Sequence, residues 1–224
     1  MDKDVINKML KPSSVAVVGA SATPGKIGYS VVMNLLKDGY QGKIYPINHK
    51  EKDILGVKCY TTLEAVPGEI DSAIMCVPAS VMKEMTIDCG KKGVKGLIVI
   101  TSGFSEIGRK DLEDEIVEIA HSYGMRVLGP NIVGSLSNSE KFNGSFCPSL
   151  PLPGKASLIS QSGALLIALA MATYTRHVGF DKLISIGNMA DVDFADLIDW
   201  FDDDDDTSCV SLYIEGLRDG RRAG

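Results

Sequence analysis

The segment Val15–Gly28 constrains the fold more than any other part of the chain, because a strand pattern runs directly into a helix pattern there. The β-branched run Val15–Val18 ends at Gly19, and a small polar loop leads into the helix. Such a loop presents N–H groups, and the helix dipole favours negative charge beside them. The glycine spacing Gly19, Gly25, Gly28 matches neither the dinucleotide pattern G-x-G-x-x-G nor the P-loop. The segment therefore predicts a phosphate-bearing ligand other than the two commonest kinds.

The same alternation continues through the first 130 residues. Further strands are expected at Lys43–Ile47, Ser72–Val77, Gly96–Thr101 and Arg126–Leu128, and helices at Ile27–Lys37, Ser80–Lys91 and Arg109–Tyr123. Alternating strands and helices predict an α/β fold, with a parallel sheet covered by helices on both sides. The carboxyl ends of the strands then form one rim, where ligands bind.

A second unit is predicted after the proline-rich linker Ser145–Lys155. Its strands are expected at Ala156–Ile159, Lys182–Ile186 and Cys209–Ile214, and its helices at Leu165–Tyr174 and Phe194–Phe201. We interpret this small open unit as the first half of a second doubly wound domain, with domains at 1–150 and 151–224. An unpaired sheet edge would favour association, so self-association or partial disorder is expected beyond about Gly154.

Composition excludes several classes of protein. The 224 residues are 45% hydrophobic and 23% charged, which is typical of a soluble globular chain. A net charge of −6 argues against general nucleic-acid binding. Five scattered cysteines and an N-terminus without a signal peptide predict a cytoplasmic protein with reduced thiols. No apolar run approaches the roughly 20 residues that span a bilayer, and no metal-ligand spacing occurs, so neither membrane nor metal binding is expected.

Small or polar residues follow each predicted strand of the first unit. His49 and Lys50 follow the second strand, where a nicotinamide-binding fold places an acidic residue. A ligand with an extra phosphate, such as NADP or coenzyme A, fits these basic groups, and an exposed lysine without function fits them equally. Val77 and Pro78 offer an apolar wall after the third strand, with Pro78 near position N1 of the next helix. Turns favour such residues anyway, so their agreement along one rim is what indicates a site.

The second unit repeats the strand–turn–helix device in the stretch SLISQSGALL. Ser162 is placed to cap the following helix, either as a simple N-cap or as part of a second anion site. The pattern S-x-S-G differs from the G-x-S-x-G nucleophile elbow. The run Asp202–Asp206 is interpreted as a solvated helix end and loop, because a calcium loop needs alternating ligands. His121 and His177 fall late in predicted helices, with no identifiable partner.

Seven motifs occur in one order along the chain: VVGASATPGKIG, YPINHK, CVPA, ITSGFSE, GPN, SQSGA and YIEGL. Together they resemble the α-subunit or α-region of NDP-forming acyl-CoA synthetases, over essentially the whole chain. The chain is most similar to ADP-forming acetate–CoA ligases, and succinyl-CoA synthetase is more distant. The resemblance implies a Rossmann-like CoA-binding domain followed by a partial flavodoxin-like ligase domain. It also implies conversion of acyl-CoA, ADP and phosphate to acid, CoA and ATP through an acyl phosphate and a phosphohistidine.

The resemblance also assigns roles to residues of this chain. The groups that would bind the CoA phosphates are Gly19, Ser21, Thr23, Pro24 and Gly25, with Lys50 as a cationic partner. Those that would contact the CoA body and line the path to its thiol are Val77, Pro78, Ser102, Gly103, Glu106 and Asn131. The helix start at Ser162 and Gly163 would stabilise the phosphohistidine, and Glu215 would orient that histidine.

Two departures from the family pattern bear on these expectations. Ile132 stands where the family usually has a cysteine after GPN, and the phosphorylated histidine lies downstream of YIEGL, outside these residues. We therefore expect the chain to be inactive alone. It would need a nucleotide-binding β-subunit or domain, with ADP or ATP and Mg²⁺, and an oligomer is expected. The alternatives are a stand-alone CoA-sensing module and an NAD(P)-binding oxidoreductase.

Overall fold

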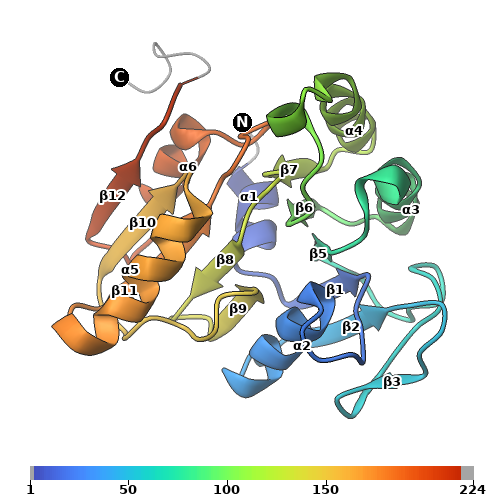
Figure 1. Ribbon diagram of the computed structural model, residues 1–224, viewed down its shortest axis with the longest axis horizontal. Coiled ribbons are helices and arrows are strands. Elements are labelled where there is room, and N and C mark those ends of the chain that lie inside the picture. Colours follow the sequence, from blue (N-terminus) through green and yellow to red (C-terminus); the bar gives the residue numbers. More distant parts are fainter. Residues whose placement is uncertain (1–2, 218–224) are drawn as a thin grey trace.

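The computed structural model describes residues 3–217, which form two units around two five-stranded sheets (Figure 1). The strands of the first sheet are β1 (Ser14–Val18), β2 (Lys43–Ile47), β5 (Ser72–Met75), β6 (Gly96–Val99) and β7 (Arg126–Leu128). They are all parallel, in the order β2-β1-β5-β6-β7. The chain turns outward from β1 to β2 and then returns to β5. The crevice between the carboxyl ends of β1 and β5 is therefore the switch point, where such sheets bind ligands.

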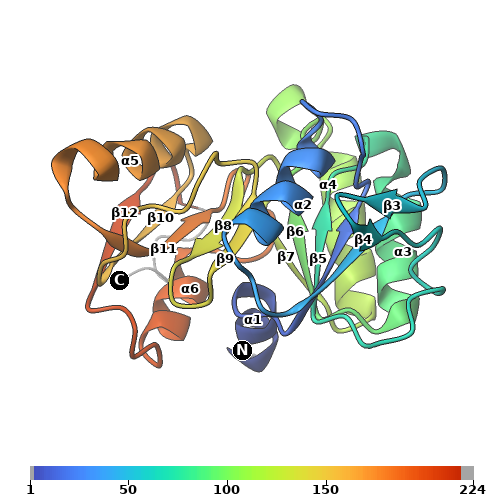
Figure 2. The ribbon, with the colours of Figure 1, turned by 90° about the horizontal axis from the view of Figure 1, so that it is seen from below.

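Helices cover the first sheet on both faces, as the alternation predicts. They are α1 (Lys3–Leu10) and α2 (Ile27–Lys37) on one face, and α3 (Met82–Lys92) and α4 (Lys110–Ser122) on the other (Figure 2). Val15 and Val17 join the core under α1 and α2, while Ala16 and Val18 join the core under α3 and α4. This period of two explains why β1 is an unbroken apolar run, since both of its faces are buried. No helix within the described residues is long and apolar enough to cross a membrane.

The second sheet contains two strands that the sequence analysis did not predict. Its strands are β8 (Gly134–Ser137), β9 (Phe142–Ser145), β10 (Ala156–Ser160), β11 (Phe180–Ser185) and β12 (Cys209–Tyr213), in the order β12-β10-β11-β8-β9. β10 is parallel to β11 and β12, whereas β8 pairs antiparallel with β11 and β9 pairs antiparallel with β8. The hairpin sequences GSLS and FNGS have weak strand propensity, so burial rather than propensity makes them strands. The chain therefore enters the second sheet before it reaches the proline-rich segment.

The two units share one hydrophobic core. Ile159, Ile184 and Trp200 from β10, β11 and α6 (Phe194–Phe201) belong to the same buried cluster as Val17 and Ile98 of the first sheet. A separate cluster fills the other face of the second sheet beneath α5 (Gly163–Arg176). The edge strand β12 is largely exposed. That this exposed edge promotes self-association stays a prediction.

The predicted boundaries agree closely in some elements and differ where a rim loop begins. β2, α2, β7 and α6 have the expected bounds, whereas β5 and β6 each end two residues early. The expected helix start after β5 is wrong in detail. Pro78 is the N-cap of a short 3-10 turn, Ala79–Val81, and α3 begins only at Met82. A second 3-10 turn, Ser105–Ile107, precedes α4, and a small hairpin, β3 (Asp53–Ile54) and β4 (Val57–Lys58), follows β2. α1 was not predicted.

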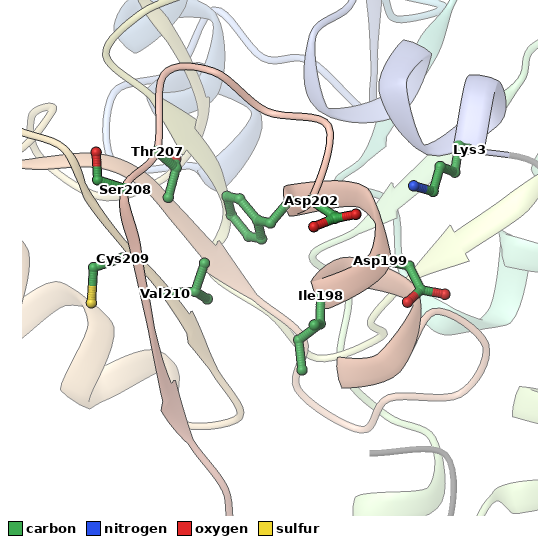
Figure 3. A pocket seen from close by; sticks show the side chains of 9 residues that line it. Lys3, Ile198, Asp199, Asp202, Thr207, Ser208, Cys209 and Val210 are labelled. Carbon is green, nitrogen blue, oxygen red and sulfur yellow. The ribbon is translucent and has the colours of Figure 1, made fainter. Parts of the chain in front are cut away.

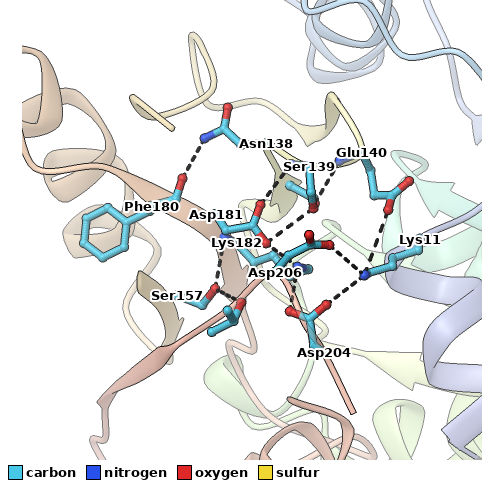
Figure 4. Close-up of polar contacts among 12 residues, drawn as sticks. Lys11, Asn138, Ser139, Glu140, Ser157, Phe180, Asp181, Lys182, Asp204 and Asp206 are labelled. Atoms are coloured by element: carbon cyan, nitrogen blue, oxygen red, sulfur yellow. Dashed lines mark hydrogen bonds and ion pairs between the residues drawn. The ribbon is translucent and has the colours of Figure 1, made fainter. Parts of the chain in front are cut away.

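The aspartate run Asp202–Asp206 is not simply a solvated loop, which corrects the sequence interpretation. Asp204 is 6% exposed and accepts a 2.7 Å hydrogen bond from Lys182 Nζ, and Nζ of Lys11, the residue directly after α1, lies 2.7 Å from its other oxygen (Figure 4). Lys182 also pairs with Asp181. Burial alone would raise the pKa of Asp204, but the hydrogen bonds from Lys11 and Lys182 outweigh it and lower that pKa. This buried ion cluster joins α1 of the first unit to the second sheet.

Candidate functional site

Two glycines at the switch point let three backbone segments meet closely. Gly19 has φ of +85°, and a Cβ there would lie 2.8 Å from the carbonyl oxygen of Cys76 and 2.9 Å from a methyl of Val77. A Cβ on Gly28 would lie 2.1 Å from the carbonyl oxygen of Gly19. Gly25 also has φ of +85° but faces open space. Gly19 and Gly28 therefore pack the loop between the end of β5 and the start of α2, whereas Gly25 contributes only its backbone conformation.

The start of α2 is open to an anion. Its N-cap is Lys26, and among the residues described here no side chain caps this end of the helix. The preceding loop is exposed from Ala22 to Lys26, and within it Ser21 Oγ accepts a 3.1 Å hydrogen bond from the N–H of Thr23. The first N–H groups of a helix lack partners within the helix, and the dipole adds partial positive charge there. The predicted residues Ser21, Thr23, Pro24 and Gly25 thus lie together beside this helix start.

Asn48, at the end of β2, ties the basic residues to this loop. Its Nδ2 donates a 2.7 Å hydrogen bond to the carbonyl oxygen of Ala20, and its Oδ1 accepts a 2.8 Å bond from the N–H of Lys50. His49 and Lys50 are exposed. The two basic residues are predicted from the sequence as ligand contacts, whereas Asn48 of the same YPINHK motif is not. The structure places Lys50 one strand away from the Gly19 loop.

The middle of the rim is apolar. Val77 is half-buried and Pro78 is exposed where β5 ends. Thr101 Oγ1, beyond β6, donates to the carbonyl oxygen of Val77 at 2.7 Å, which ties the third and fourth strand ends together. Burial raises the pKa of the neighbouring Cys76 thiol to about 12. Cys76 is therefore neutral at ordinary pH and offers no thiolate nucleophile.

The far end of the rim is polar again. The N–H groups of Gly103 and Phe104 donate to the carboxylate of Glu106, the latter at 3.2 Å. Burial alone would raise the pKa of Glu106, but hydrogen bonds from Gly103 and from a side chain of the second unit lower it. Asn131 has φ of +61°, and its N–H donates to the carbonyl oxygen of Thr101 at 2.9 Å. Together with exposed Ser102, these groups form a cluster around an ionised carboxylate.

A residue that the sequence analysis missed completes this cluster from the second unit. Asn188 Nδ2 donates to Glu106 Oε2 at 2.6 Å, and Asn188 Oδ1 accepts from Asn131 Nδ2 at 3.2 Å. A signal was available, because Gly187 and Asn188 directly follow a predicted strand, as the other rim residues do. The pattern of small or polar residues after a strand, predicted for the first unit, thus also holds at this strand of the second unit.

The second strand–turn–helix segment is built differently. Ser162 is the N-cap of α5, and its side chain accepts a 3.3 Å hydrogen bond from the N–H of Leu165, which confirms the expected cap. A Cβ on Gly163 would lie 2.7 Å from a methyl of Val133, so this turn lies close to the segment that follows Asn131. The start of α5 is therefore near the polar end of the rim.

Gln161 joins this turn to the segment that carries Glu215. Its Oε1 accepts hydrogen bonds from the N–H groups of Glu215 at 2.6 Å and Gly216 at 3.0 Å. Glu215 itself is exposed. The structure thus brings the SQSGA and YIEGL motifs side by side, through a glutamine that the sequence analysis quoted but did not assign.

Two of the three histidines, His121 and His177, have structural contacts. His121 Nε2 lies 3.1 Å from Asp191 Oδ1, and Asp191 also accepts from Arg126 Nε at 2.9 Å, so the expectation that His121 lacks a partner was wrong. His177 is the C-cap of α5, with φ of +55°. Within residues 3–217, no group of three or more His, Cys, Asp or Glu is arranged to hold a metal ion.

A hollow of about 500 Å³ lies away from the rim (Figure 3). It is bounded by α1, α6 and the start of β12; its lining residues include Lys3, Ile198, Asp199, Asp202 and Cys209. Because Cys209 is at the amino end of β12, this hollow lies at the end of the second sheet opposite to Gln161 and Ser162. Open parallel sheets bind ligands at the carboxyl ends of their strands, so the rim rather than this hollow is the candidate site.

Comparisons with known proteins identify both units of the chain. A family model described as a CoA binding domain matches residues 13–136, and a succinyl-CoA ligase-like flavodoxin domain matches residues 153–223. The ADP-forming acetate–CoA ligase I subunit alpha of Pyrococcus furiosus is 47% identical, over 97% of this chain and 48% of its own length. The ADP-forming acetate–CoA ligase of Methanocaldococcus jannaschii is 48% identical, over 94% of this chain and 30% of its own length.

A solved structure shows the same fold. The apo form of the dinucleotide-forming acetyl-coenzyme A synthetase 1 of Candidatus Korarchaeum cryptofilum matches with a TM-score of 0.94 and 47% identity, over 96% of this chain and 47% of that one. The chain thus spans about half the length, or less, of these relatives. On the family match and this similarity, the chain belongs to the CoA binding domain family, within the α-region of NDP-forming acyl-CoA synthetases.

Proposed function

We propose that this chain is the CoA-binding portion of an ADP-forming acyl-CoA ligase of the acetate type. The observation that carries the proposal is the sequence of chemistries along the rim of the first sheet. An open helix start and Lys50 lie at one end, the apolar Val77 and Pro78 lie in the middle, and a polar cluster around Glu106 lies at the other end. CoA has the same order of parts: phosphates, a pantetheine arm and a thiol.

Each part of the rim has a role in this proposal. The loop Gly19–Gly25 and the first turn of α2 hold the CoA phosphates with backbone N–H groups, and Lys50 adds a positive charge. Val77 and Pro78 pack against the CoA body. Ser102, Gly103, Glu106 and Asn131 surround the end of the arm. These functional roles extend the family assignment to individual residues.

The proposed reaction converts acyl-CoA, ADP and phosphate to acid, CoA and ATP through an acyl phosphate and a phosphohistidine. Phosphoryl transfer depends mainly on positioned donors and on charge stabilisation. In the complete protein, the start of α5 at Ser162 and Gly163 would stabilise the phosphohistidine, and Glu215 would orient the imidazole and fix its tautomer. We also propose domains at 1–150 and 151–224, with the hairpin β8–β9 of the first range completing the second sheet.

The complete protein would supply what this chain does not. We propose that the phosphorylated histidine and a nucleotide-binding β-subunit or domain, with ADP or ATP and Mg²⁺, lie outside these 224 residues, so that this chain alone binds CoA without completing the reaction. The relatives are named as ADP-forming ligases, and some of them as alpha subunits. We further propose that the protein works in the cytoplasm as an oligomer.

Calorimetric titration with CoA, NAD and NADP tests the CoA site directly. We expect micromolar affinity for CoA and a fall of about fivefold in Lys50→Ala, because one exposed charge–phosphate contact contributes about 1 kcal/mol. Lys43→Ala is the matched control, since Lys43 is exposed at the opposite end of the same strand. No binding signal for CoA, together with a clear signal for NAD or NADP, would instead support the oxidoreductase alternative.

A further inference from the structure

We propose that Asn188 of the second unit is a positioning residue for the thiol end of the CoA site, which sets the Glu106 carboxylate and the Asn131 amide. The inference rests on the proposed CoA-binding function. It extends that function, because it makes the β11–α6 loop of the second unit part of a site that otherwise belongs to the first unit.

The side-chain amide of Asn188 uses both of its ends on first-unit residues. Its Nδ2 donates to Glu106 Oε2 at 2.6 Å and to Glu113 Oε2 at 2.9 Å. Its Oδ1 accepts from Asn131 Nδ2 at 3.2 Å. Glu113 is 5% exposed and is held in turn by the hydroxyl of Ser105 at 2.7 Å. One neutral amide therefore connects two carboxylates and the side chain of Asn131.

The backbone around Asn188 is docked as tightly as its side chain. The N–H of Asn188 donates to the carbonyl oxygen of Pro130 at 3.0 Å, and the N–H of Ala190 donates to that of Gly129 at 2.8 Å. A Cβ on Gly187 would lie 2.4 Å from the carbonyl oxygens of Pro130 and Asn131. The approach of the two loops thus requires glycine at position 187, and it holds Asn188 over the rim.

The charges explain why an amide suits this position. Glu106 and Glu113 both lie within hydrogen-bond distance of one Nδ2, so their carboxylates are close to each other. Like charges at such distances repel, and a shared donor offsets the repulsion. The lowered pKa of Glu106 agrees with a donor that favours its ionised form. Without Asn188, the Glu106 carboxylate would lose its cross-unit partner and its fixed direction.

The test compares two ligands on the same variants. CoA reaches both ends of the rim, whereas 3′-phosphoadenosine 5′-diphosphate has the nucleotide end and no pantetheine arm. We expect Asn188→Ala to weaken CoA binding about tenfold, in line with the loss of hydrogen bonds to a charged group, and to leave the affinity for the arm-less nucleotide unchanged. Asn188→Asp should weaken CoA binding further, because it adds a third carboxylate, and lowering the pH should reduce that extra loss.

Asn138→Ala is the matched control. Asn138 Nδ2 also donates two hydrogen bonds, to the carbonyl oxygens of Pro151 and Phe180, but within the second unit and away from the rim. Its loss should lower the melting temperature without changing the ratio of the two affinities. If Asn188→Ala does not fold, Asn188→Ser retains one donor and should show an intermediate loss for CoA alone.

Three results would count against the proposal. Equal losses for CoA and for the arm-less nucleotide in Asn188→Ala would mean a purely structural role, and unchanged CoA affinity would mean no role. Absence of CoA binding by the unsubstituted chain would overturn the proposed function itself, and this inference with it.

Discussion

The two units of the molecule each run from a parallel strand through a turn into a helix, but the two helix starts differ. α5 is closed by its own residue, since Ser162 accepts from the N–H of Leu165. α2 begins at Lys26 without a side-chain cap and follows an exposed loop. A capped helix start has already used part of its anion-binding capacity, whereas an uncapped one retains it. The same strand–turn–helix pattern in the sequence therefore gives one capped helix start and one that is open to an anion.

The two sheets also differ in how far each one depends on the other unit. The first sheet is wholly parallel, and its strands are buried by four helices and by the second unit. The second sheet is mixed and keeps an exposed edge at β12. It is tied to the first unit through the ion cluster of Lys11, which directly follows α1, with Lys182 and Asp204. The first unit therefore forms most of the rim from its own residues. The second unit is anchored on the first and contributes Asn188 to that rim.

The largest effect should come from the anchor of the second unit. Lys182→Met keeps the apolar stem but leaves Asp181 buried without its ammonium partner and leaves Asp204 with Lys11 alone. We expect the free energy of unfolding to fall by about 3 kcal/mol or more, as for other broken buried ion pairs, measured by urea denaturation. Lys3→Met is the control, because the Lys3–Asp203 pair is exposed, and it should have no measurable effect. Equal stability of the two variants would mean that this ion cluster does not anchor the second unit.

The same anchor should make stability depend on pH. The pKa of Asp204 is lower in the folded chain than its ordinary value, so Asp204 contributes stability above its unfolded pKa and loses it as pH falls through the folded pKa. Thermal unfolding of the unsubstituted chain should therefore show a decline below about pH 4. This part of the decline should shrink in Lys182→Met.

A smaller effect is expected from the turn glycines. Gly19→Ala combines a positive φ with a contact of 2.8 Å to a backbone carbonyl, so it should cost about 3 kcal/mol of stability and weaken CoA binding. Gly25→Ala has the same φ but open space, and should cost only about 1 kcal/mol. In the second unit, Gly163 lacks a positive φ, and Gly163→Ala would meet a side-chain methyl of Val133 at 2.7 Å rather than a backbone carbonyl. A cost for Gly163→Ala as large as that for Gly19→Ala would show that the two turns are equally constrained.

The smallest effect tests the open helix start. Lys26 has the extended conformation that a capping serine adopts, with φ of −81° and ψ of 143°. Lys26→Ser should therefore raise the unfolding free energy by up to about 1 kcal/mol and weaken CoA binding, because its hydroxyl would occupy a donor that the phosphates need. Lys26→Ala removes the same charge without adding a cap. Equal CoA affinities for the two variants would show that the α2 start is not part of the phosphate site.

The elements predicted well are those with strong local signals. β1 is a valine-rich run that ends at a glycine, β2 holds two isoleucines and a tyrosine between polar residues, and α6 has a capping box formed by Asp193 and Asp196. The hairpin β8–β9 was missed because its short serine- and glycine-containing strands carry little propensity. They become strands only because β8 pairs with β11 and β9 pairs with β8. Asp204 was misjudged for a related reason, since its partners Lys11 and Lys182 are distant in sequence.

The sequence by itself determined the alternation of strands and helices, the glycine loop before α2 and the polar strand ends, because these depend on hydrophobic periodicity and on turn chemistry within a few residues. Only the tertiary structure decided that β8 and β9 complete the second sheet, that an aspartate run anchors it, and that Asn188 reaches Glu106 across the boundary between the units. The contacts of β8 with β11, of Lys182 with Asp204 and of Asn188 with Glu106 join residues more than 20 positions apart. Their free energy comes from burial and charge pairing that no local pattern encodes.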